Sequence, residues 1–439
     1  MKSHDLKRRF FEFFERREHI FVPSAPLIFD NQKKLLTSSG IEYFEKYFKS
    51  EINPLDDPEP RLNKPLGAPN AVSSQYCFRP EDAENVGDNS HLTFFEMLTA
   101  LTFGGYKKQT AIKITSDFFK NLNIFIDYVT IFSGGSGFSL DKDSEYIWKE
   151  LGATYIQRLG LKENFWGPAG DEGICGSTSE IYIKDIGVWN VVFVDYYFPD
   201  THKKLISGKN IRKIERLDVQ GIASVTGLER LTAVANGKSN VFETDIFDGL
   251  FLPLQNTALT ERQKRIAVDH LRAVCFLANE IPAGESEQLL KIGIRNLLRR
   301  LFVYERLIKI TEGLFEEIIE KMVKLYNSDF KNPADSIRII NDIIKKERLG
   351  FTEMMAKGLK ELLKKKSENS LIDAPIAFYF YEKFGLPFES IKEFSGVGAK
   401  NLTREDFENE LKKHQIVSGK LEEKSGIGSR IKELWSKIP

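Results

Sequence analysis

The chain has 439 residues, of which 41% are hydrophobic and 29% are charged, so it is long enough for two or three folded domains and shows no sign of large-scale disorder. Lysine plus arginine and aspartate plus glutamate both total 63, so net charge neither supports nor excludes a nucleic-acid partner, which would need a local basic face. The three cysteines, Cys77, Cys175 and Cys275, are odd in number and widely spaced. This spacing argues against a disulfide framework or a zinc knuckle and favours a reducing compartment.

Membrane and targeting signals are not evident in the sequence. No uninterrupted apolar run approaches the roughly 18 to 20 residues of a membrane span, and no signal-peptide pattern precedes the first element. The arginine-rich start contains Asp5, Glu12, Glu15 and Glu18, which a transit peptide would avoid. We therefore expect a cytoplasmic protein.

The first half of the chain predicts a helix followed by an antiparallel sheet. Leu6, Phe10, Phe13 and Phe14 recur at helical spacing. Residues 51–70 contain five prolines and predict an irregular connection. Short β-rich runs separated by turns then predict strands, at 181–183, 188–194 and 222–225.

From about Glu261 the pattern becomes helical, so we place a domain boundary near Leu254, with one domain at 1–254 and a helical one at 255–439. In a helix predicted over 351–366, one face is apolar and another carries Lys357, Lys360 and Lys364. Such a lysine face is more often solvated than functional, with RNA contact as the alternative. Glycine pairs at 396–398 and 426–428 favour turns over phosphate loops.

The segment from Arg79 to Tyr106 carries the strongest chemical signal. An arginine that ends an apolar run can fork onto a phosphate, and the returning Phe94-Phe95 pair offers a ring for adenine. At 226–230 the run T-G-L-E-R supplies a glycine that lets backbone approach a ligand, followed by Arg230. Two arginines and one phenylalanine could clamp one bent nucleotide, although surface arginines in ion pairs are the simpler alternative.

The two segments resemble motif 2 and motif 3, respectively, of the class II aminoacyl-tRNA synthetases. The sequences H-L-T-F-F-E-M and G-L-E-R-L are similar to those of the alanyl-tRNA synthetases. Further blocks follow in the family's order over roughly the first 300 residues, among them N-F-W at 164–166, W-N-V-V-F at 189–193 and R-I-A-V-D-H-L-R-A at 265–273. The resemblance implies an α+β fold, with a class II antiparallel sheet flanked by helices and then an all-helical tRNA-binding domain.

The resemblance implies catalytic roles for Arg79, at the α-phosphate of ATP and the incoming carboxylate, and for Arg230, at the triphosphate and the outer face of adenine. Phe95 is the residue expected to stack on adenine, because the basic residue His91 stands four positions before it, which matches the basic-x-x-x-Phe spacing of the class motif. Glu229 is a candidate for orienting Arg230 or for holding Mg²⁺. Two loop carboxylates could contact the adenine amino group or be solvated: Glu81 and Asp82.

The family also implies an alanine pocket. Its expected residues are Met97, Trp166, Asn190, Val192 and Gly227. Ala223 stands where family members carry an aspartate for the substrate ammonium. Asp195 has the wrong strand parity relative to Asn190 to replace it, so the ammonium partner is left open.

In the helical half the resemblance implies recognition of the acceptor stem of tRNA(Ala). Gly284 stands where the family has an asparagine that reads the stem, and Glu382 stands where it has a second reader, an aspartate. The expected positively charged contacts are Arg272, Arg295, Arg299, Arg300 and Lys360.

The six histidines form neither H-x-x-x-H nor C-x-x-x-H, so we expect no zinc and no editing site. We expect a minimal, monomeric form, natural or a fragment, that uses ATP and Mg²⁺ to make alanyl-adenylate and transfers alanine to tRNA. A paralogue that activates another small amino acid or loads a different acceptor is one alternative. A non-catalytic RNA-binding relative is another, and retention of Arg79 and Arg230 speaks against it.

Overall fold

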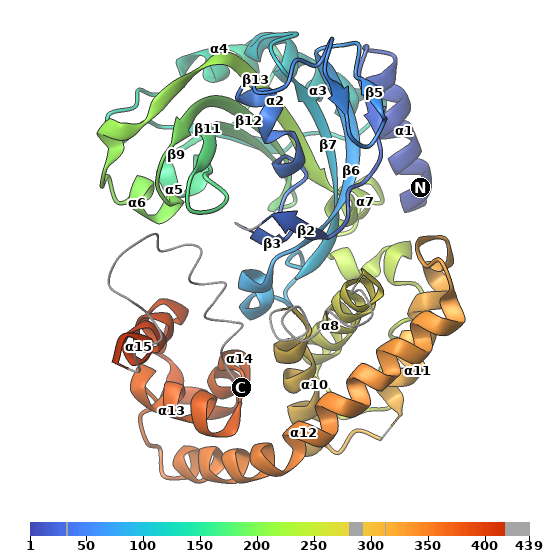
Figure 1. The fold of residues 1–439 in the computed structure, drawn as a ribbon, viewed down its shortest axis with the longest axis vertical. Helices are drawn as coiled ribbons and strands as arrows, with labels where there is room; N and C mark the ends of the chain where they lie inside the picture. Colours follow the sequence, from blue (N-terminus) through green and yellow to red (C-terminus); the bar gives the residue numbers. More distant parts are fainter. Residues whose placement is uncertain (32–33, 281–292, 312, 418–439) are drawn as a thin grey trace. The chain divides into compact units, whose positions relative to one another are not determined.

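The computed structural model describes residues 1–31, 34–280, 293–311 and 313–417. The chain divides into two units, one formed by Met1–Arg79 with Phe94–Asp248 and the other by Pro80–Thr93 with Gly249–Pro439 (Figure 1). The second unit thus contains a short segment from the middle of the first. The sequence-based boundary near Leu254 does not include this segment, because no composition change marks it.

The first unit is built on a nine-stranded sheet. Its strands, in spatial order, are β1 (Ile20–Val22), β6 (Asn70–Phe78), β7 (Phe94–Thr102), β13 (Glu215–Gly227), β12 (Ile186–Phe198), β11 (Gly173–Ile183), β8 (Tyr128–Phe132) and β9 (Ile156–Leu159), with β10 (Phe165–Trp166) paired to β11. The strands from β6 to β8 pair antiparallel, as predicted, while β1 and β9 add to the sheet in parallel. The sheet is therefore mixed, with its antiparallel centre in the predicted place.

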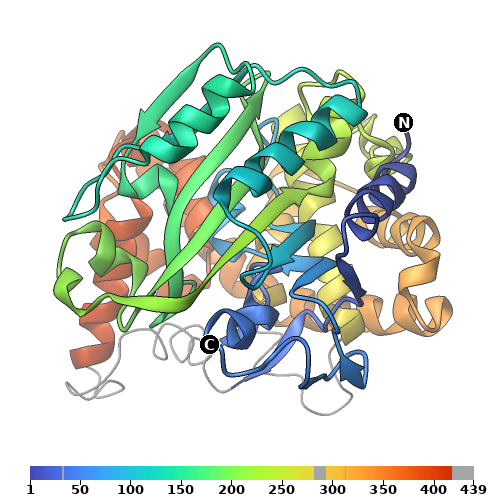
Figure 2. The same ribbon diagram turned by 90° about the horizontal axis from the view of Figure 1, so that it is seen from above.

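One face of this sheet is covered by helices. Their bounds are α1 (Ser3–Glu15), α3 (Lys108–Asn121) and α4 (Lys142–Glu150). Trp189 of β12 lies against Phe10 and Phe14 of α1 and Phe118 of α3, and Figure 2 shows α3 and α4 running over the strands. The predicted apolar spacing of α1 is confirmed, since Leu6, Phe10, Phe13 and Phe14 are all buried.

The opposite face carries a second apolar cluster, because side chains alternate along a strand. Met97, Val192 and Ala223 belong to it, together with Phe48 of the short helix α2 (Glu45–Phe48). Residues 51–70, predicted as irregular, contain one small hairpin between β4 (Pro58–Glu59) and β5 (Lys64–Pro65). The remaining elements of this unit are β2 (Ile28–Asn31), β3 (Lys34–Leu36), α5 (Leu161–Asn164), α6 (His202–Ile206) and α7 (Leu228–Ala235).

The second unit is helical, as predicted. Its helices are α8 (Glu261–Glu280), α10 (Arg295–Ile308), α11 (Leu314–Leu325), α12 (Pro333–Ser367), α13 (Ala374–Phe384), α14 (Phe388–Ser395) and α15 (Arg404–Val417), and Pro80–Glu84 forms the 3-10 turn η2. The helix predicted over 351–366 is the second half of α12, which begins at an Asn332 cap followed by proline. Met355, Leu359 and Leu362 are buried there, and Lys357, Lys360 and Lys364 are exposed.

In the part of the chain that the structure describes, the three cysteines are buried and none forms a disulfide. Across the described ranges no helix is both long and apolar enough to cross a membrane.

Candidate active site

The residues predicted for the amino-acid pocket lie on the face of the sheet opposite to α1 and α3. Met97, Val192 and the partly buried Trp166 belong to one apolar cluster. The sulfur of Met97 accepts a hydrogen bond from the Gly40 amide at 3.2 Å, which fixes its side chain. The structure therefore brings these three predicted residues together, and they come from β7, β12 and β10.

Arg79 and Phe95 also meet on this face. The end of β6 carries Arg79, and Phe95 lies opposite Cys77 in the adjoining strand β7. The Arg79 guanidinium lies 4.9 Å from the centre of the Phe95 ring, and its Nε donates to the Ser38 carbonyl at 2.9 Å. Both side chains are half-buried, whereas Phe94 is fully buried in the core, as strand alternation predicts.

Gly227 ends β13 beside the same ring. A Cβ atom at this position would lie 3.9 Å from Cδ2 of Phe95, so any side chain here would cover part of the ring. The turn into α7 then places Arg230, whose Nη1 donates to the Gly187 carbonyl at 3.0 Å. Arg79, Phe95 and Gly227 thus lie on one face of the sheet, and Arg230 follows Gly227 by three positions.

Glu229 has a different environment from its neighbour Arg230. Its carboxylate is 1% exposed and both of its oxygens accept the Glu96 amide, each at 3.2 Å. Glu96 in turn accepts from Ser74 at 2.6 Å and pairs with Lys7. This geometry suits Glu229 to fixing the start of α7, and thereby the base of Arg230.

Glu180 is a residue of this face that sequence reasoning missed. It lies opposite Asn190 in the β11–β12 register; Asn190 Nδ2 donates to its Oε1 at 3.0 Å, and the Tyr182 hydroxyl donates to its Oε2 at 2.9 Å. Burial raises the pKa of Glu180, while the Tyr182 hydrogen bond and the charge of Arg230 act in the opposite direction. The usable signal was strand parity, since Glu180 and Asn190 are cross-strand partners.

The Asn190 amide leaves one acceptor unused. Among the described residues its Oδ1 is buried and has no hydrogen-bond partner. Ala223, two positions from the cross-strand partner of Asn190, is fully buried and apolar. The polar group in this corner of the pocket is thus Asn190 with Glu180, and a buried acceptor beside a carboxylate is suited to a cationic donor.

Asp195 lies on the other face, as its parity predicts. Burial raises the pKa of Asp195, and the charges of Lys108 and Arg216 oppose this shift. Lys108 belongs to α3, on the helix-covered side of the sheet, where it pairs with Asp141 at 2.7 Å. Asp195 therefore does not take part in the pocket.

Three predicted ATP-contacting residues belong to the second unit and are described within it. Glu81 is exposed and Asp82 is half-buried. His91 Nδ1 lies 2.5 Å from Asp88 Oδ2. Burial opposes the ionisation of Asp88, but hydrogen bonds from His91 and Ser90 outweigh it and lower the pKa of Asp88 to about 2.

The predicted RNA-contacting residues fall into different environments. Arg272, Arg299 and Arg300 are buried inside the helical unit, at 2%, 7% and 2% exposure. Arg295 forms a two-point ion pair with Glu347, both distances being 2.8 Å. Three of these guanidinium groups are buried and the fourth is ion-paired, and RNA contact by the four arginines stays a prediction.

Two predicted RNA contacts lie on the surface. Lys360 is exposed on α12, and Glu382 is exposed on α13 beside His414, with 3.2 Å between Oε1 and Nε2. Gly284 lies outside the described residues.

Arg79 directly follows β6 of the nine-stranded sheet, Arg230 lies in the first turn of α7 after β13, and the Phe95 ring contacts Arg79. This arrangement indicates a class of protein. The profile of the tRNA synthetases class II (A) matches residues 5–437, so the chain belongs to this family and has its catalytic fold.

Curated relatives carry one shared name. The alanine–tRNA ligase of Borrelia hermsii is 27% identical over 457 residues, covering 96% of this chain and 73% of that protein. The alanine–tRNA ligase of Rubrobacter xylanophilus is 32% identical over 438 residues, covering 90% of this chain and 47% of that protein. The chain thus spans between about half and three quarters of the length of these relatives. A solved pyrrolysyl-tRNA synthetase from Desulfitobacterium hafniense matches 55% of this chain and 71% of its own length at 12% identity, with a TM-score of 0.33.

Proposed function

We propose that this protein is an alanine–tRNA ligase, which joins alanine to ATP as alanyl-adenylate and then transfers alanine to the 3′ end of tRNA(Ala). The observation that carries the proposal is the grouping of Arg79, Phe95 and Gly227 on one sheet face, where the charge of Arg230 also acts on Glu180. Family membership and the shared name of the curated relatives support it.

In the first step the substrate carboxylate attacks the α-phosphorus of ATP and pyrophosphate leaves. Arg79 neutralises the charge that develops between the carboxylate and the α-phosphate, and Arg230 holds the triphosphate. Adenine lies on Phe95, whose ring Gly227 leaves open. Catalysis is then mainly positioning, since a guanidinium needs no change of protonation state.

The family also uses Mg²⁺, which neutralises phosphate charge when bound. Hard cations need carboxylate or carbonyl oxygens. Both oxygens of Glu229 face the Glu96 amide inside the protein, so in this structure Glu229 does not fit the role of metal ligand. Among the described residues, no three acidic, histidine or cysteine side chains gather as a metal site.

The substrate ammonium needs a partner where Ala223 has no carboxylate. We propose that it donates to the unused Asn190 Oδ1 and to Glu180, which supplies the negative charge. Met97, Val192 and Trp166 would then enclose the methyl group.

For the RNA substrate we propose the acceptor stem, with Lys360 and Glu382 as surface contacts. That the protein works as a monomer in the cytoplasm stays a prediction.

Amino-acid-dependent exchange of pyrophosphate into ATP, measured with a panel of small amino acids, tests the proposal. Alanine is expected to give the highest kcat/KM, with serine and glycine lower by roughly 10- to 200-fold, since a missing methyl or an added hydroxyl changes binding by about 1 to 3 kcal/mol. A higher value for another amino acid would favour a paralogue, to which Ala223 points. No exchange with any amino acid would reject the ligase function.

A further inference from the structure

The segment Pro80–Thr93 joins two residues of the candidate site. It begins directly after Arg79 and ends two positions before Phe95. Yet its contacts place it in the helical unit. Consecutive Cα atoms are about 3.8 Å apart, so each end of the segment lies within one or two residues of a side chain proposed to hold ATP.

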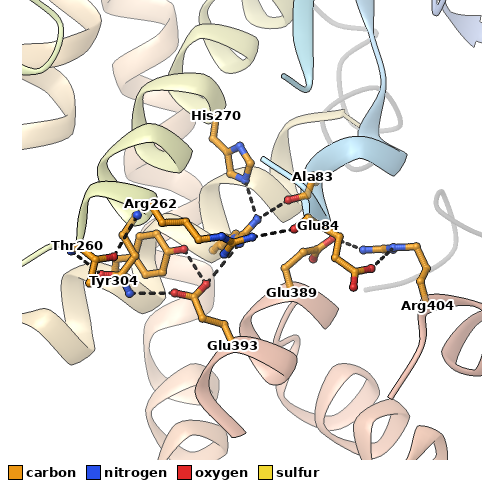
Figure 3. Close-up of polar contacts among 11 residues, drawn as sticks. Ala83, Glu84, Thr260, Arg262, His270, Tyr304, Glu389, Glu393 and Arg404 are labelled. Atoms are coloured by element: carbon orange, nitrogen blue, oxygen red, sulfur yellow. Dashed lines mark hydrogen bonds and ion pairs between the residues drawn. The ribbon is translucent and has the colours of Figure 1, made fainter. Parts of the chain in front are cut away.

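A buried arginine of α10 holds the start of the segment. Arg300 donates from Nη1 to the Ala83 carbonyl at 2.7 Å, and its Nη2 lies 3.4 Å from Glu393 of α14. The Tyr304 hydroxyl also donates to Glu393, at 2.8 Å (Figure 3). Arg300 is 2% exposed, and a charge buried to this degree is stable only where several partners surround it.

Charged groups also surround the next residue, Glu84. Its carboxylate pairs with Lys392 of α14 and lies 3.7 Å from Nε of Arg404 in α15. Its carbonyl accepts from Arg262 of α8 at 2.9 Å. Figure 3 shows Glu84 between Ala83 and Arg404, with Glu389 beside it. Three helices therefore meet at one residue of the segment.

The middle and end of the segment contact α8. Arg265 donates to the carbonyls of Gly87 and Asp88, at 3.3 and 3.2 Å. Gly87 has φ +101°, and a Cβ there would lie 2.9 Å from the Arg262 carbonyl, so only glycine allows this approach. At the far end Asp269 accepts from the Thr93 amide at 2.9 Å and from its hydroxyl at 2.5 Å.

We propose that the helical unit sets the position of Pro80–Thr93, with Arg300 as the main positioning residue, and thereby controls how tightly Arg79 and Phe95 hold ATP. The inference rests on the proposed function, because it assigns ATP to that pair. Repacking of α8, α10 or α14, as by a bound RNA, then changes ATP affinity through the segment without touching the nucleotide.

Arg300→Lys tests this in the full chain. Lysine keeps the charge but does not reproduce the fork to the Ala83 carbonyl and Glu393. The Kd of ATP, measured by calorimetry, is expected to rise about 10- to 100-fold, as for a displacement of about 1 Å in a reacting site. Hydrogen exchange of the amides at 80–93, measured without ATP, is expected to speed up.

A matched control separates positioning from general stability. Arg348 pairs with Glu305 and Glu316 between α12, α10 and α11, at 2.8 and 2.7 Å, and touches no part of the segment. Arg348→Lys is therefore expected to lower the thermal midpoint while leaving the Kd of ATP unchanged. Glu84→Gln, which keeps the side-chain shape and removes the charge, is expected to act like Arg300→Lys to a smaller degree.

The outcomes distinguish the inference from the function on which it rests. If the wild type does not bind ATP, the proposed function fails and the inference fails with it. If the wild type binds ATP and neither Arg300→Lys nor Glu84→Gln changes the Kd, the inference alone is wrong. The same holds if Arg348→Lys weakens ATP binding as much as Arg300→Lys does, or if exchange at 80–93 speeds up with no change in Kd.

Discussion

The two units use arginine in different ways. On the sheet face of the first unit, Arg79 and Arg230 are half-buried, and their assigned hydrogen bonds go to the carbonyls of Ser38 and Gly187. In the helical unit, Arg300 is buried and Arg348 is half-buried, and both are ion-paired with carboxylates of other helices. A half-buried guanidinium that is bound only to a carbonyl can exchange this partner for a phosphate, whereas a guanidinium that is paired with several carboxylates stabilises the packing of the helices around it. Local environment, more than residue type, separates a catalytic arginine from a structural one.

Removal of Arg79 from the sheet face is expected to have the largest effect on activity. Arg79→Ala should lower the kcat/KM of alanine-dependent pyrophosphate exchange by about 10² or more, because a charge contact made in the transition state is lost. The thermal midpoint should change little, since a half-buried side chain over one ring contributes little to stability.

Arg348→Ala should show the reverse pattern. It leaves Glu305 and Glu316 without their partner, which should lower the midpoint while exchange below it stays near that of the wild type. If both variants lose activity in proportion to stability, the contrast between the units is wrong.

The second prediction concerns the carboxylate beside Asn190. Glu180→Gln keeps the side-chain shape and removes the charge proposed to hold the substrate ammonium. The KM for alanine is expected to rise about tenfold, as for loss of one charged hydrogen bond, while the KM for ATP is unchanged. Asp195→Asn is the matched control, because Asp195 is also a half-buried carboxyl group with a raised pKa but lies on the helix-covered face. An equal effect of both variants would indicate general loss of the sheet.

Most of the fold could be predicted from the sequence, because its signals are local. The apolar stripe of α1 and the β-rich runs at 188–194 and 222–225 gave the right elements. The parallel strands β1 and β9 were missed, since three or four residues carry little periodicity. The placement of Pro80–Thr93 was missed for another reason. It depends on contacts with residues some 180 to 320 positions away.

The candidate site shows the same limit. Arg79, Phe95, Gly227 and Arg230 could be selected because each stands in a recognisable motif. Glu180 was not selected, since its role depends on its cross-strand partner, Asn190, and on the unused acceptor beside it. The exposure of individual arginines in the helical half could not be predicted from the sequence either. Arg299 and Arg300 are buried among the apolar residues of α10, and residues of other helices supply their polar partners.

The smallest expected effect is on RNA binding, and it compares an exposed lysine of the helical unit with a buried arginine. Lys360 is exposed on α12, whereas Arg299 is 7% exposed and donates to the Gly385 carbonyl at 3.4 Å. If Lys360 contacts a phosphate, Lys360→Ala should weaken binding of the acceptor stem for all stem sequences alike. It should also lower the slope of log affinity against log salt by about 0.9, the counterion release of one contact. Arg299→Lys should leave that slope unchanged, because a buried charge releases no counterions. If the slope falls for Arg299→Lys and not for Lys360→Ala, the phosphate contact belongs to Arg299 and not to Lys360. The helices would then have to rearrange when RNA binds and expose their interior arginines. Equal slopes for all three proteins would place the phosphate contacts elsewhere and leave the lysine face of α12 as a solvated one.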